Sequence, residues 1–358
     1  MSKHIELLVG TRKGAFILDS DEARREWHVR GPYCETWPVH DLVRDPADGT
    51  LYAGGGSAWY GPSVWRSDDD GTTWTQSSEG LTYGDDGPKI ETIWNLTPAH
   101  GVLYAGVEPA GLFRSDDGGR TWSHVAGLRE HPSRPEWQPG NGGLCLHSIA
   151  PHPTDPDRLW VGISAVGAFE TTDGGKTWEL RNKGIRADFM PEPLPEFGFC
   201  VHKLRVVAAH PETLYQQNHC GVYRSDDGGR QWTEITGDLP SDFGFPMVIH
   251  PHDPKTIYVI PLNGADKGRH MTDGRAAVWR SRDRGDSWQE LISGLPQEHA
   301  YLGVLREAMS IDSFDRPGVY FGTSTGQVFG SADEGDHWQL LADFLPAVWS
   351  VEAAVVED

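Results

Sequence analysis

Short apolar runs alternate with turn-forming residues along the whole chain, and this pattern predicts strands rather than helices. The stretch 143–181 shows the unit clearly, with strand-like segments at 143–150, 159–163, 167–171 and 177–181 separated by residues such as Gly, Asp, Pro and Thr. Runs of β-branched and aromatic residues bounded by regular turn signals are typical of all-β proteins. We therefore predict an inner, a second, a third and an outer strand in this unit.

The same unit recurs, and an eight-residue motif marks each copy. The motif has Ser or Thr first, Asp two positions later, Gly four positions later and Trp seven positions later. Six copies follow it, at 67–74, 115–122, 171–178, 225–232, 281–288 and 331–338. A degenerate seventh copy, Ser20 to Trp27, has Glu22 in place of the Asp and Arg24 in place of the Gly. Seven such units fill the chain and predict an all-β, seven-bladed β-propeller, a single domain over residues 1–358.

The octet resembles the Asp-box, or BNR, motif of sialidases and their relatives, in which the motif is structural. Its residue types suit a tight hairpin, because Gly permits a positive φ, and Asp and Ser or Thr side chains can accept bonds from turn amides. The Trp is expected to pack between neighbouring sheets. A second resemblance, to bacterial BNR-repeat or glycosyl-hydrolase-like proteins, rests on GTRKGAF at 10–16 and QQNHCGVYRS at 216–225. We therefore expect the repeated aspartates to be structural.

The two ends of the chain predict how the propeller closes. The first unit lacks an inner strand at the amino end, since residues 7–10 already match the second strand at 103–106. The spare segment 347–356 at the carboxyl end matches an inner strand. We predict that this segment completes the first blade and closes the ring.

Composition narrows the range of partners. The chain has 31 Lys and Arg against 52 Asp and Glu, a net charge of −21, which argues against binding to the phosphates of a nucleic acid. Neither a secretory apolar segment nor a run of 18 apolar residues is visible, so we expect no membrane partner and a cytoplasmic location. Four widely spread cysteines in a chain of this size favour reduced thiols.

Loop length indicates where a pocket would form. Propeller geometry places the Asp-box turns on one face, and the opposite face receives the long insertions 127–142, 182–198 and 263–275. Long loops on a rigid scaffold commonly carry binding groups. We expect the functional site on that face, at the mouth of the central channel.

Polar and aromatic residues predicted to line this mouth supply the candidate chemistry. The candidate catalytic residues are His147, His202, His219, Arg306, Glu307 and Glu108. The candidate substrate-binding residues are His40, Trp94, Trp59, Gln217, Asn218 and Arg12. Imidazoles can serve as general acid or base near neutral pH, with a carboxylate partner. Exposed Trp37, Trp59, Trp94 and Trp137 could stack on sugar rings, although we expect some of them to pack between blades instead. The alternative is ordinary hydrogen bonding around a water-filled channel.

A metal hypothesis rests on two Cys-x-His segments. Cys145 with His147 and Cys200 with His202 each share one face of a strand, because side chains alternate along it. A divalent transition metal such as zinc or copper would then be held by His147, His202 and His219, with Cys145, Cys200 or Cys220 as further ligands.

Two alternatives to this metal hypothesis remain open. Cysteines on inner strands also serve as small buried hydrophobes. Alignment of the inner strands through Pro151 and Ala209 places Arg205, rather than His202, opposite His147.

Two functions are compatible with these features. The first is an enzyme or binding protein for a small polar substrate, glycosidic or carboxylated; an enzyme would be a hydrolase. Sialidases use three arginines, a Tyr/Glu pair and an Asp, introduced by an Arg-Ile-Pro element, whereas this chain has Arg30-Gly31-Pro32 and no recognisable triad. The second is a non-catalytic scaffold whose flat face docks a protein partner.

Overall fold

The computed structural model describes residues 3–190 and 195–357, and its regular structure is almost entirely β. The chain separates into two compact units: residues 1–42 with 235–358, and residues 43–234. Four-stranded sheets make up both units. Because one unit is discontinuous in sequence, its sheets come from both ends of the chain.

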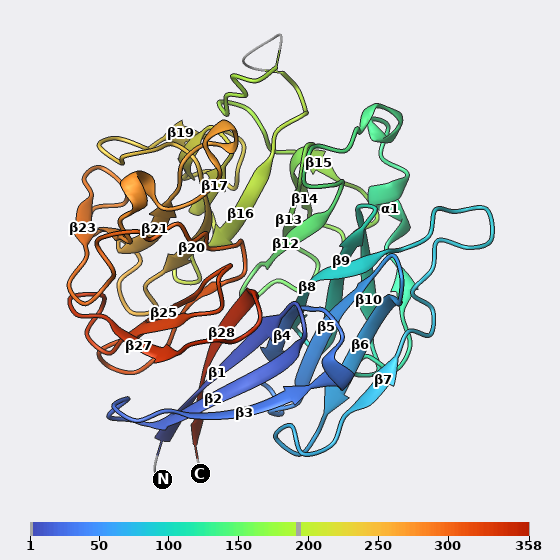
Figure 1. The fold of residues 1–358 in the computed structure, drawn as a ribbon. Coiled ribbons are helices and arrows are strands. Elements are labelled where there is room, and N and C mark those ends of the chain that lie inside the picture. The colour runs from blue at the N-terminus through green and yellow to red at the C-terminus, as the bar shows by residue number, and fades with distance from the viewer. Residues whose placement is uncertain (1–2, 191–194, 358) are drawn as a thin grey trace. The chain divides into compact units, whose positions relative to one another are not determined.

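Three of the sheets belong to the discontinuous unit. Their strand orders are β28 (Val348–Glu357), β1 (Lys3–Thr11), β2 (Gly14–Asp21), β3 (His28–Tyr33); β20 (Gly244–Ile249), β21 (Ile257–Pro261), β22 (Val278–Ser281), β23 (Gln289–Leu291); and β24 (Met309–Ile311), β25 (Val319–Gly322), β26 (Val328–Ser331), β27 (Gln339–Ala342). In the first of these sheets the carboxyl-terminal strand β28 lies antiparallel to β1 (Figure 1). The prediction that the end of the chain completes the first blade is confirmed.

The remaining sheets follow one another in sequence. They are β4 (Val39–Arg44), β5 (Leu51–Ser57), β6 (Gly61–Ser67), β7 (Thr75–Ser77); β8 (Thr92–Ala99), β9 (Val102–Glu108), β10 (Gly111–Ser115), β11 (Ser123–His124); β12 (Leu146–Pro151), β13 (Leu159–Ile163), β14 (Gly167–Thr171), β15 (Glu179–Leu180); and β16 (Val201–Val206), β17 (Leu214–Asn218), β18 (Gly221–Ser225), β19 (Thr233–Glu234). Within the described residues this makes seven blades, and the predicted all-β, seven-bladed β-propeller is confirmed. The single-domain assignment over residues 1–358 stays a prediction.

The helical segments are all short and lie in the connections. They are α1 (Ala126–Arg129) and the 3-10 turns η1 (Cys34–Thr36), η2 (Arg134–Glu136), η3 (Ala265–Lys267) and η4 (Thr272–Gly274). In the described part of the chain, none of the helices has the length and apolar character needed to cross a bilayer.

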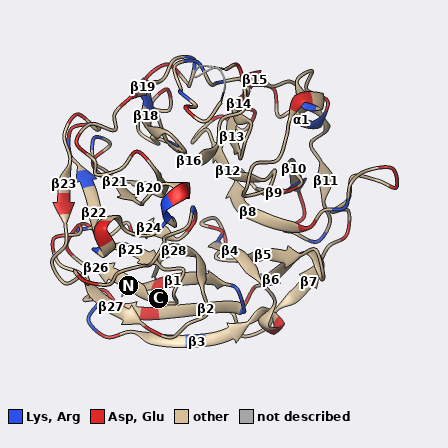
Figure 2. Ribbon diagram, turned by 45° about the horizontal axis from the view of Figure 1, so that its top comes forward, with Lys and Arg blue, Asp and Glu red and all other residues tan. Residues whose placement is uncertain are grey.

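Apolar contacts between successive blades form the core. One cluster of buried residues joins Tyr104 and Leu112 of one blade to Val161 and Phe169 of the next, together with the motif tryptophan Trp178. Burying each such side chain stabilises the fold by roughly 1.5–3 kcal/mol. Charged residues lie mainly in the connecting turns, whereas the strands are largely built of uncharged residues (Figure 2). The prediction that the motif tryptophans pack between sheets is confirmed for Trp122, Trp178, Trp232 and Trp338, each of which belongs to a buried cluster drawn from two successive blades.

The Asp-box turns have the geometry expected from their residue types. In the copy at 67–74, the Ser67 hydroxyl accepts the Gly71 amide at 2.9 Å, and Asp69 accepts the Thr73 amide at 2.8 Å. Gly71 has φ +82°, a conformation that disfavours residues with a Cβ. The aspartate is thus committed to its own turn, as predicted.

The degenerate copy keeps this turn with a different residue in the glycine position. Arg24 adopts φ +55°, and its side chain donates to Asp312 at 3.0 Å and stacks on Phe314, 4.8 Å from the ring centroid. The ion pair is almost fully buried. A buried interaction with a neighbouring blade therefore accompanies the strained backbone of this copy.

Candidate functional site

A cavity of about 550 Å³ opens between the β5–β6 hairpin and the segment that leads into β8. Its lining runs from Ala58 to Pro62 on one side and from Leu81 to Glu91 on the other. This volume lies in the usual range for small-molecule pockets, about 300–1,000 Å³. The cavity lies entirely within residues 43–234.

The hairpin presents two aromatic rings at the cavity rim. The side chain of Trp59 is 88 % exposed and that of Tyr60 is 52 % exposed. The Ser57 hydroxyl accepts the amides of both residues at 3.3 Å, and Gly61 closes the turn with φ +80°. An exposed Trp held on an ordered turn offers a flat apolar surface to a ligand.

The opposite wall combines an apolar base with carboxylates. Leu81 and Ile90 are buried, whereas Asp85, Lys89 and Glu91 are exposed. Two carboxylates against one ammonium give this wall a net negative character, which disfavours anionic ligands. Together with the aromatic rim, the wall suits a neutral ligand rich in hydroxyl groups.

Beside this cavity, two of the predicted residues form a pair. Trp94 of β8 donates its indole N–H to Oε2 of Glu108, at the end of β9, over 2.8 Å. The backbone links the pair to the cavity wall, because the Glu91 amide donates to the Glu108 carbonyl at 2.8 Å. Glu108 also lies against Gly143, where an added Cβ would clash with its carboxylate. The structure thus brings a candidate acid/base and a candidate stacking residue together.

Trp94 occupies a special backbone position that recurs in the next two blades. In β8, Ile93 and Asn95 pair with successive residues of β9, so Trp94 is the extra residue of a β-bulge. His147 in β12 and His202 in β16 occupy the same position relative to their neighbours. Bulges redirect side chains and are common next to active sites. The alternative alignment with Arg205 opposite His147 is wrong, because the bulges make His202 the structural equivalent of His147.

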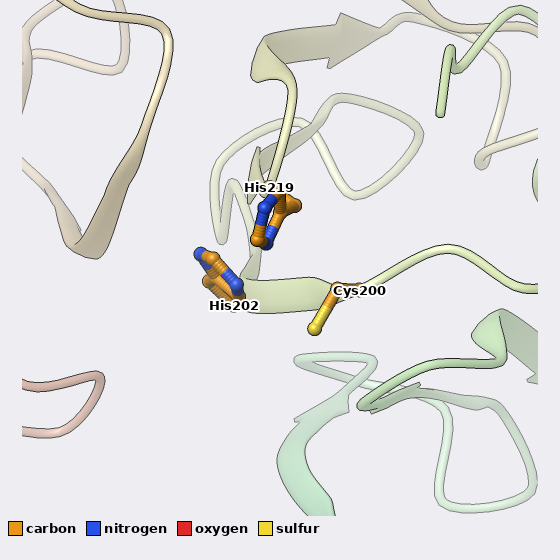
Figure 3. A group of neighbouring side chains, drawn as sticks. All are labelled: Cys200, His202 and His219. Atoms are coloured by element: carbon orange, nitrogen blue, oxygen red, sulfur yellow. The ribbon is translucent and has the colours of Figure 1, made fainter. Parts of the chain in front are cut away.

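The predicted histidine and cysteine cluster forms in part. Ligand atoms of Cys200, His202 and His219 all lie within 4.8 Å of one another. Figure 3 shows Cys200 and His202 near the start of one strand and His219 on the adjacent turn. The imidazole rings of His202 and His219 meet edge to face, with centroids 5.5 Å apart.

The remaining predicted ligands lie outside this group of three. Among the residues that the structure describes, neither His147 nor Cys145 nor Cys220 joins it. His147 is fully buried, with Nδ1 3.4 Å from the Ser148 hydroxyl. Cys145 and Cys220 are buried as well, and the Cys220 carbonyl accepts the Tyr223 hydroxyl at 2.6 Å. These cysteines match the alternative of small buried hydrophobes.

Gln217 and Asn218 are buried in strand β17. The side-chain amide of Gln217 donates to the backbone carbonyls of Asn218 and Gly221. Asn218 Oδ1 accepts the backbone amide of His219 at 2.6 Å. These bonds order the turn that carries His219. Their predicted contact with substrate stays a prediction.

In the other unit, His40 stacks on Trp349 with ring centroids 4.2 Å apart. Burial lowers the pKa of His40 to about 3, so its imidazole is neutral at physiological pH. Trp349 is the extra residue of a bulge in β28, where Thr11 pairs with Val348 and Gly10 with Ser350. This pair offers a flat aromatic surface rather than a proton donor.

Arg306, Glu307 and Arg12 lie in the same unit as His40. The Arg306 guanidinium lies over Phe245, 4.9 Å from the ring centroid. The Glu307 carbonyl accepts the Val351 amide at 2.8 Å, and Arg12 is exposed in the β1–β2 turn. That these residues converge with those of residues 43–234 on one channel mouth stays a prediction.

One of the four candidate stacking tryptophans follows the alternative of packing between blades. Trp137 is buried against Phe169 and donates to the Ser133 hydroxyl at 2.9 Å. Sequence reasoning missed Asp85, Lys89 and Glu91 as cavity residues. The Gly- and Asp-rich stretch 84–91 is the only sequence signal for them, and it predicts a loop without saying what the loop faces.

Comparisons with known proteins agree with this architecture. The family model described as BNR/Asp-box repeat matches residues 113–124 and 169–180. The chain is 25 % identical over 284 residues to a probable oligoxyloglucan-reducing end-specific xyloglucanase of Neosartorya fischeri. This match covers 65 % of this chain and 33 % of the relative. It is 30 % identical over 227 residues to a xyloglucanase of a Paenibacillus species, which covers 54 % of this chain and 20 % of the relative.

A solved structure has the same fold. An ancestral GH74 enzyme matches 85 % of this chain and 38 % of its own, with a TM-score of 0.59 and 17 % identity. The chain is a β-propeller, and the Asp-box repeat model matches turns of two of its blades. More particularly, its sequence is similar to parts of xyloglucanases, of whose length it spans a third or less in the two relatives described.

Proposed function

We propose that this protein binds a neutral oligosaccharide of the xyloglucan class in the cavity rimmed by Trp59 and Tyr60. The observation that carries the proposal is the 88 % exposed Trp59 ring at the edge of a cavity of about 550 Å³. Sugar rings present C–H faces that stack on indole, while their hydroxyls bond to polar groups. Asp85 and Glu91 supply acceptors for those hydroxyls.

The charge of the cavity selects among glycans. Its two carboxylates and the net charge of −21 disfavour a carboxylated sugar. The similarity to xyloglucanases supports a neutral glucan backbone instead. Within the broader hypothesis of a small polar or glycosidic ligand, we therefore favour the neutral glycan.

Binding titrations test this proposal. Xyloglucan oligosaccharides, cello-oligosaccharides and sialyllactose are titrated calorimetrically into the protein and into Trp59→Ala. We expect binding of the neutral glucans alone, weakened at least about tenfold by the substitution, which corresponds to about 1.4 kcal/mol. Phe344→Ala, which removes a 93 % exposed ring elsewhere, is the control and leaves binding unchanged. Absence of glucan binding, or equal affinity in Trp59→Ala, would overturn the proposal and favour the protein scaffold.

A second candidate function is hydrolysis of the bound glycan. Glycosidases commonly use two carboxylates on either side of the bond that is cleaved. Glu91 and Glu108 lie at the same end of the paired strands β8 and β9, joined by a backbone hydrogen bond, and Glu91 lines the cavity. Measuring the new reducing ends that the protein produces from xyloglucan tests hydrolysis separately from binding.

A further inference from the structure

Three metal-ligating side chains meet at the start of β16, away from the aromatic cavity. Cys200 immediately precedes the strand, His202 lies within it, and His219 lies in the two-residue turn between β17 and β18. Their ligand atoms are all within 4.8 Å of one another. His202 is buried, and Cys200 and His219 are half-buried.

The backbone fixes this arrangement. The His219 amide donates to the Cys200 carbonyl at 3.0 Å, which ties the turn to the residue before β16. The same amide also donates to Asn218 Oδ1 at 2.6 Å, and this bond orders the turn itself. The bulge in β16 makes His202 the extra residue between Val201 and Lys203. The backbone positions of the three residues are therefore held near one another by local structure.

The donor set indicates which ion would bind. One sulfur and two imidazole nitrogens suit zinc and neighbouring late first-row divalent ions, whereas magnesium and calcium prefer oxygen ligands. In a tetrahedral zinc site with bonds of about 2.0–2.3 Å, neighbouring ligand atoms are ~3.3–3.7 Å apart. The ligand atoms of Cys200, His202 and His219 lie within 4.8 Å of one another, and this upper limit is about 1 Å longer than the distances in such a zinc site. Small side-chain rotations would close this difference.

Neighbouring groups support the ligands. The Ser164 hydroxyl lies 3.2 Å from Cys200 Sγ, where it can donate to a thiolate. Phe189 packs edge to face against the His219 ring, with centroids 5.0 Å apart. Hydrogen bonds and packing around the first ligands commonly orient them and tune metal affinity.

We propose that Cys200, His202 and His219 bind one zinc ion, or a chemically similar divalent transition metal, and leave a fourth coordination position open. Three protein ligands with an open position are typical of sites that bind water or a substrate group rather than of closed structural sites. The fully buried His147 takes no part. This site is separate from the glycan proposal, and either can fail without the other.

Metal binding is measured on the full chain. The protein is purified under reducing conditions, stripped with a chelator and titrated with zinc against a chromophoric competitor, and bound metal is counted by mass spectrometry. We expect one equivalent in the unmodified protein. Cobalt substitution gives the absorption of a thiolate-to-metal charge transfer, which reports on the sulfur directly.

Variants decide between this site and adventitious binding. Cys200→Ser and His219→Gln are expected to weaken zinc binding at least about 100-fold, and Cys200→Ser to abolish the charge-transfer band. His210→Gln, which changes an exposed histidine of the same blade, is the control and keeps full binding. Circular dichroism checks the fold, and His219→Gln decides the outcome if Cys200→Ser unfolds. Less than about a tenth of an equivalent of zinc, or unchanged affinity in His219→Gln, would overturn the proposal.

Discussion

His147 and His202 occupy equivalent positions in successive blades, each as the extra residue of a bulge near the start of an inner strand. Their surroundings nevertheless differ. His202 faces His219 and Cys200, whereas His147 has the Ser148 hydroxyl 3.4 Å from its Nδ1. The difference comes from the following turn: of these two blades as the structure describes them, the one with the β17–β18 turn places a histidine beside the bulge. The same backbone position can thus hold a metal ligand in one blade and a core residue in the next.

We predict that His147 and His202 respond differently to replacement by Gln. His147→Gln should cost about 1–3 kcal/mol of unfolding free energy, because a polar amide replaces a fully buried ring, yet it should keep one equivalent of zinc. His202→Gln should lose the metal. Chemical denaturation and metal counting measure the two effects on the same samples. Loss of zinc in folded His147→Gln would place His147 in the site after all.

The blades could be predicted from the sequence because the residues of the Asp-box determine the geometry of its turn locally. Ser, Asp, Gly and Trp at fixed spacing specify a hairpin by local hydrogen bonding and by a positive φ, and strands β13 and β14 lie where they were predicted. Inner strands carry no such local signal. Strand β12 begins at Leu146 rather than at residue 143, after Gly143 with φ +87°.

Site residues were harder to predict because bulges and loop packing depend on tertiary contacts. A bulge shifts the side-chain alternation by one residue, and no residue type in the sequence reveals it. For this reason the sequence alone left both Arg205 and His202 as possible equivalents of His147. Burial of Trp137 depends on its contact with Phe169, 32 positions away in the chain. Trp94 and Glu108 were each predicted as site residues, but their hydrogen bond depends on the pairing of β8 with β9 and could not be predicted from the sequence.

A second prediction concerns the degenerate Asp-box. Arg24→Ala should destabilise the protein by about 3–5 kcal/mol, because Asp312 would lose its buried partner. Arg24→Gly should be more stable than Arg24→Ala by about 1 kcal/mol, since glycine tolerates the positive φ. Urea denaturation measures both, with the exposed Arg25→Ala as the control. Equal stabilities of the Ala and Gly variants would show that the backbone is unstrained.

A third prediction concerns acid stability. Bonds from the Thr121 amide and hydroxyl, reinforced by Ser115, lower the pKa of Asp117 to about 2. The corresponding unfolded value is about 3.9, so Asp117 contributes stability above pH 4 that is lost as the pH falls towards 2. Asp117→Asn should therefore flatten the decline in unfolding free energy between about pH 4 and pH 2. The exposed Asp315→Asn is the control, and an identical pH slope in Asp117→Asn contradicts the prediction.

A fourth prediction follows from the neutral imidazole of His40. Because burial lowers its pKa to about 3, the unfolded chain binds a proton between about pH 6.5 and pH 3 that the folded chain does not. The free energy of unfolding should therefore decrease as the pH is lowered through this range, and His40 should contribute up to about 1.4 kcal/mol per pH unit to that decrease. His40→Phe keeps a ring against Trp349 and should lose less stability between pH 7 and pH 5 than the unmodified protein. Denaturation at both pH values, with exposed His28→Gln as the control, checks this, and an unchanged difference would contradict it.

The last prediction separates glycan hydrolysis from glycan binding. Glu108→Gln keeps an acceptor for the Trp94 indole N–H, whose bond to Oε2 is 2.8 Å long, so the local structure should survive. The substitution removes the carboxyl group that would exchange a proton with the glycosidic bond or with water. If the protein hydrolyses xyloglucan, Glu108→Gln should lower reducing-end release at least about 100-fold, while oligosaccharide affinity changes less than about threefold. Trp59→Ala should show the opposite balance, with affinity lost first. Unchanged turnover in Glu108→Gln would show that Glu108 takes no part in hydrolysis. If the variant instead lost affinity but kept its turnover per bound substrate, Glu108 would be a binding residue.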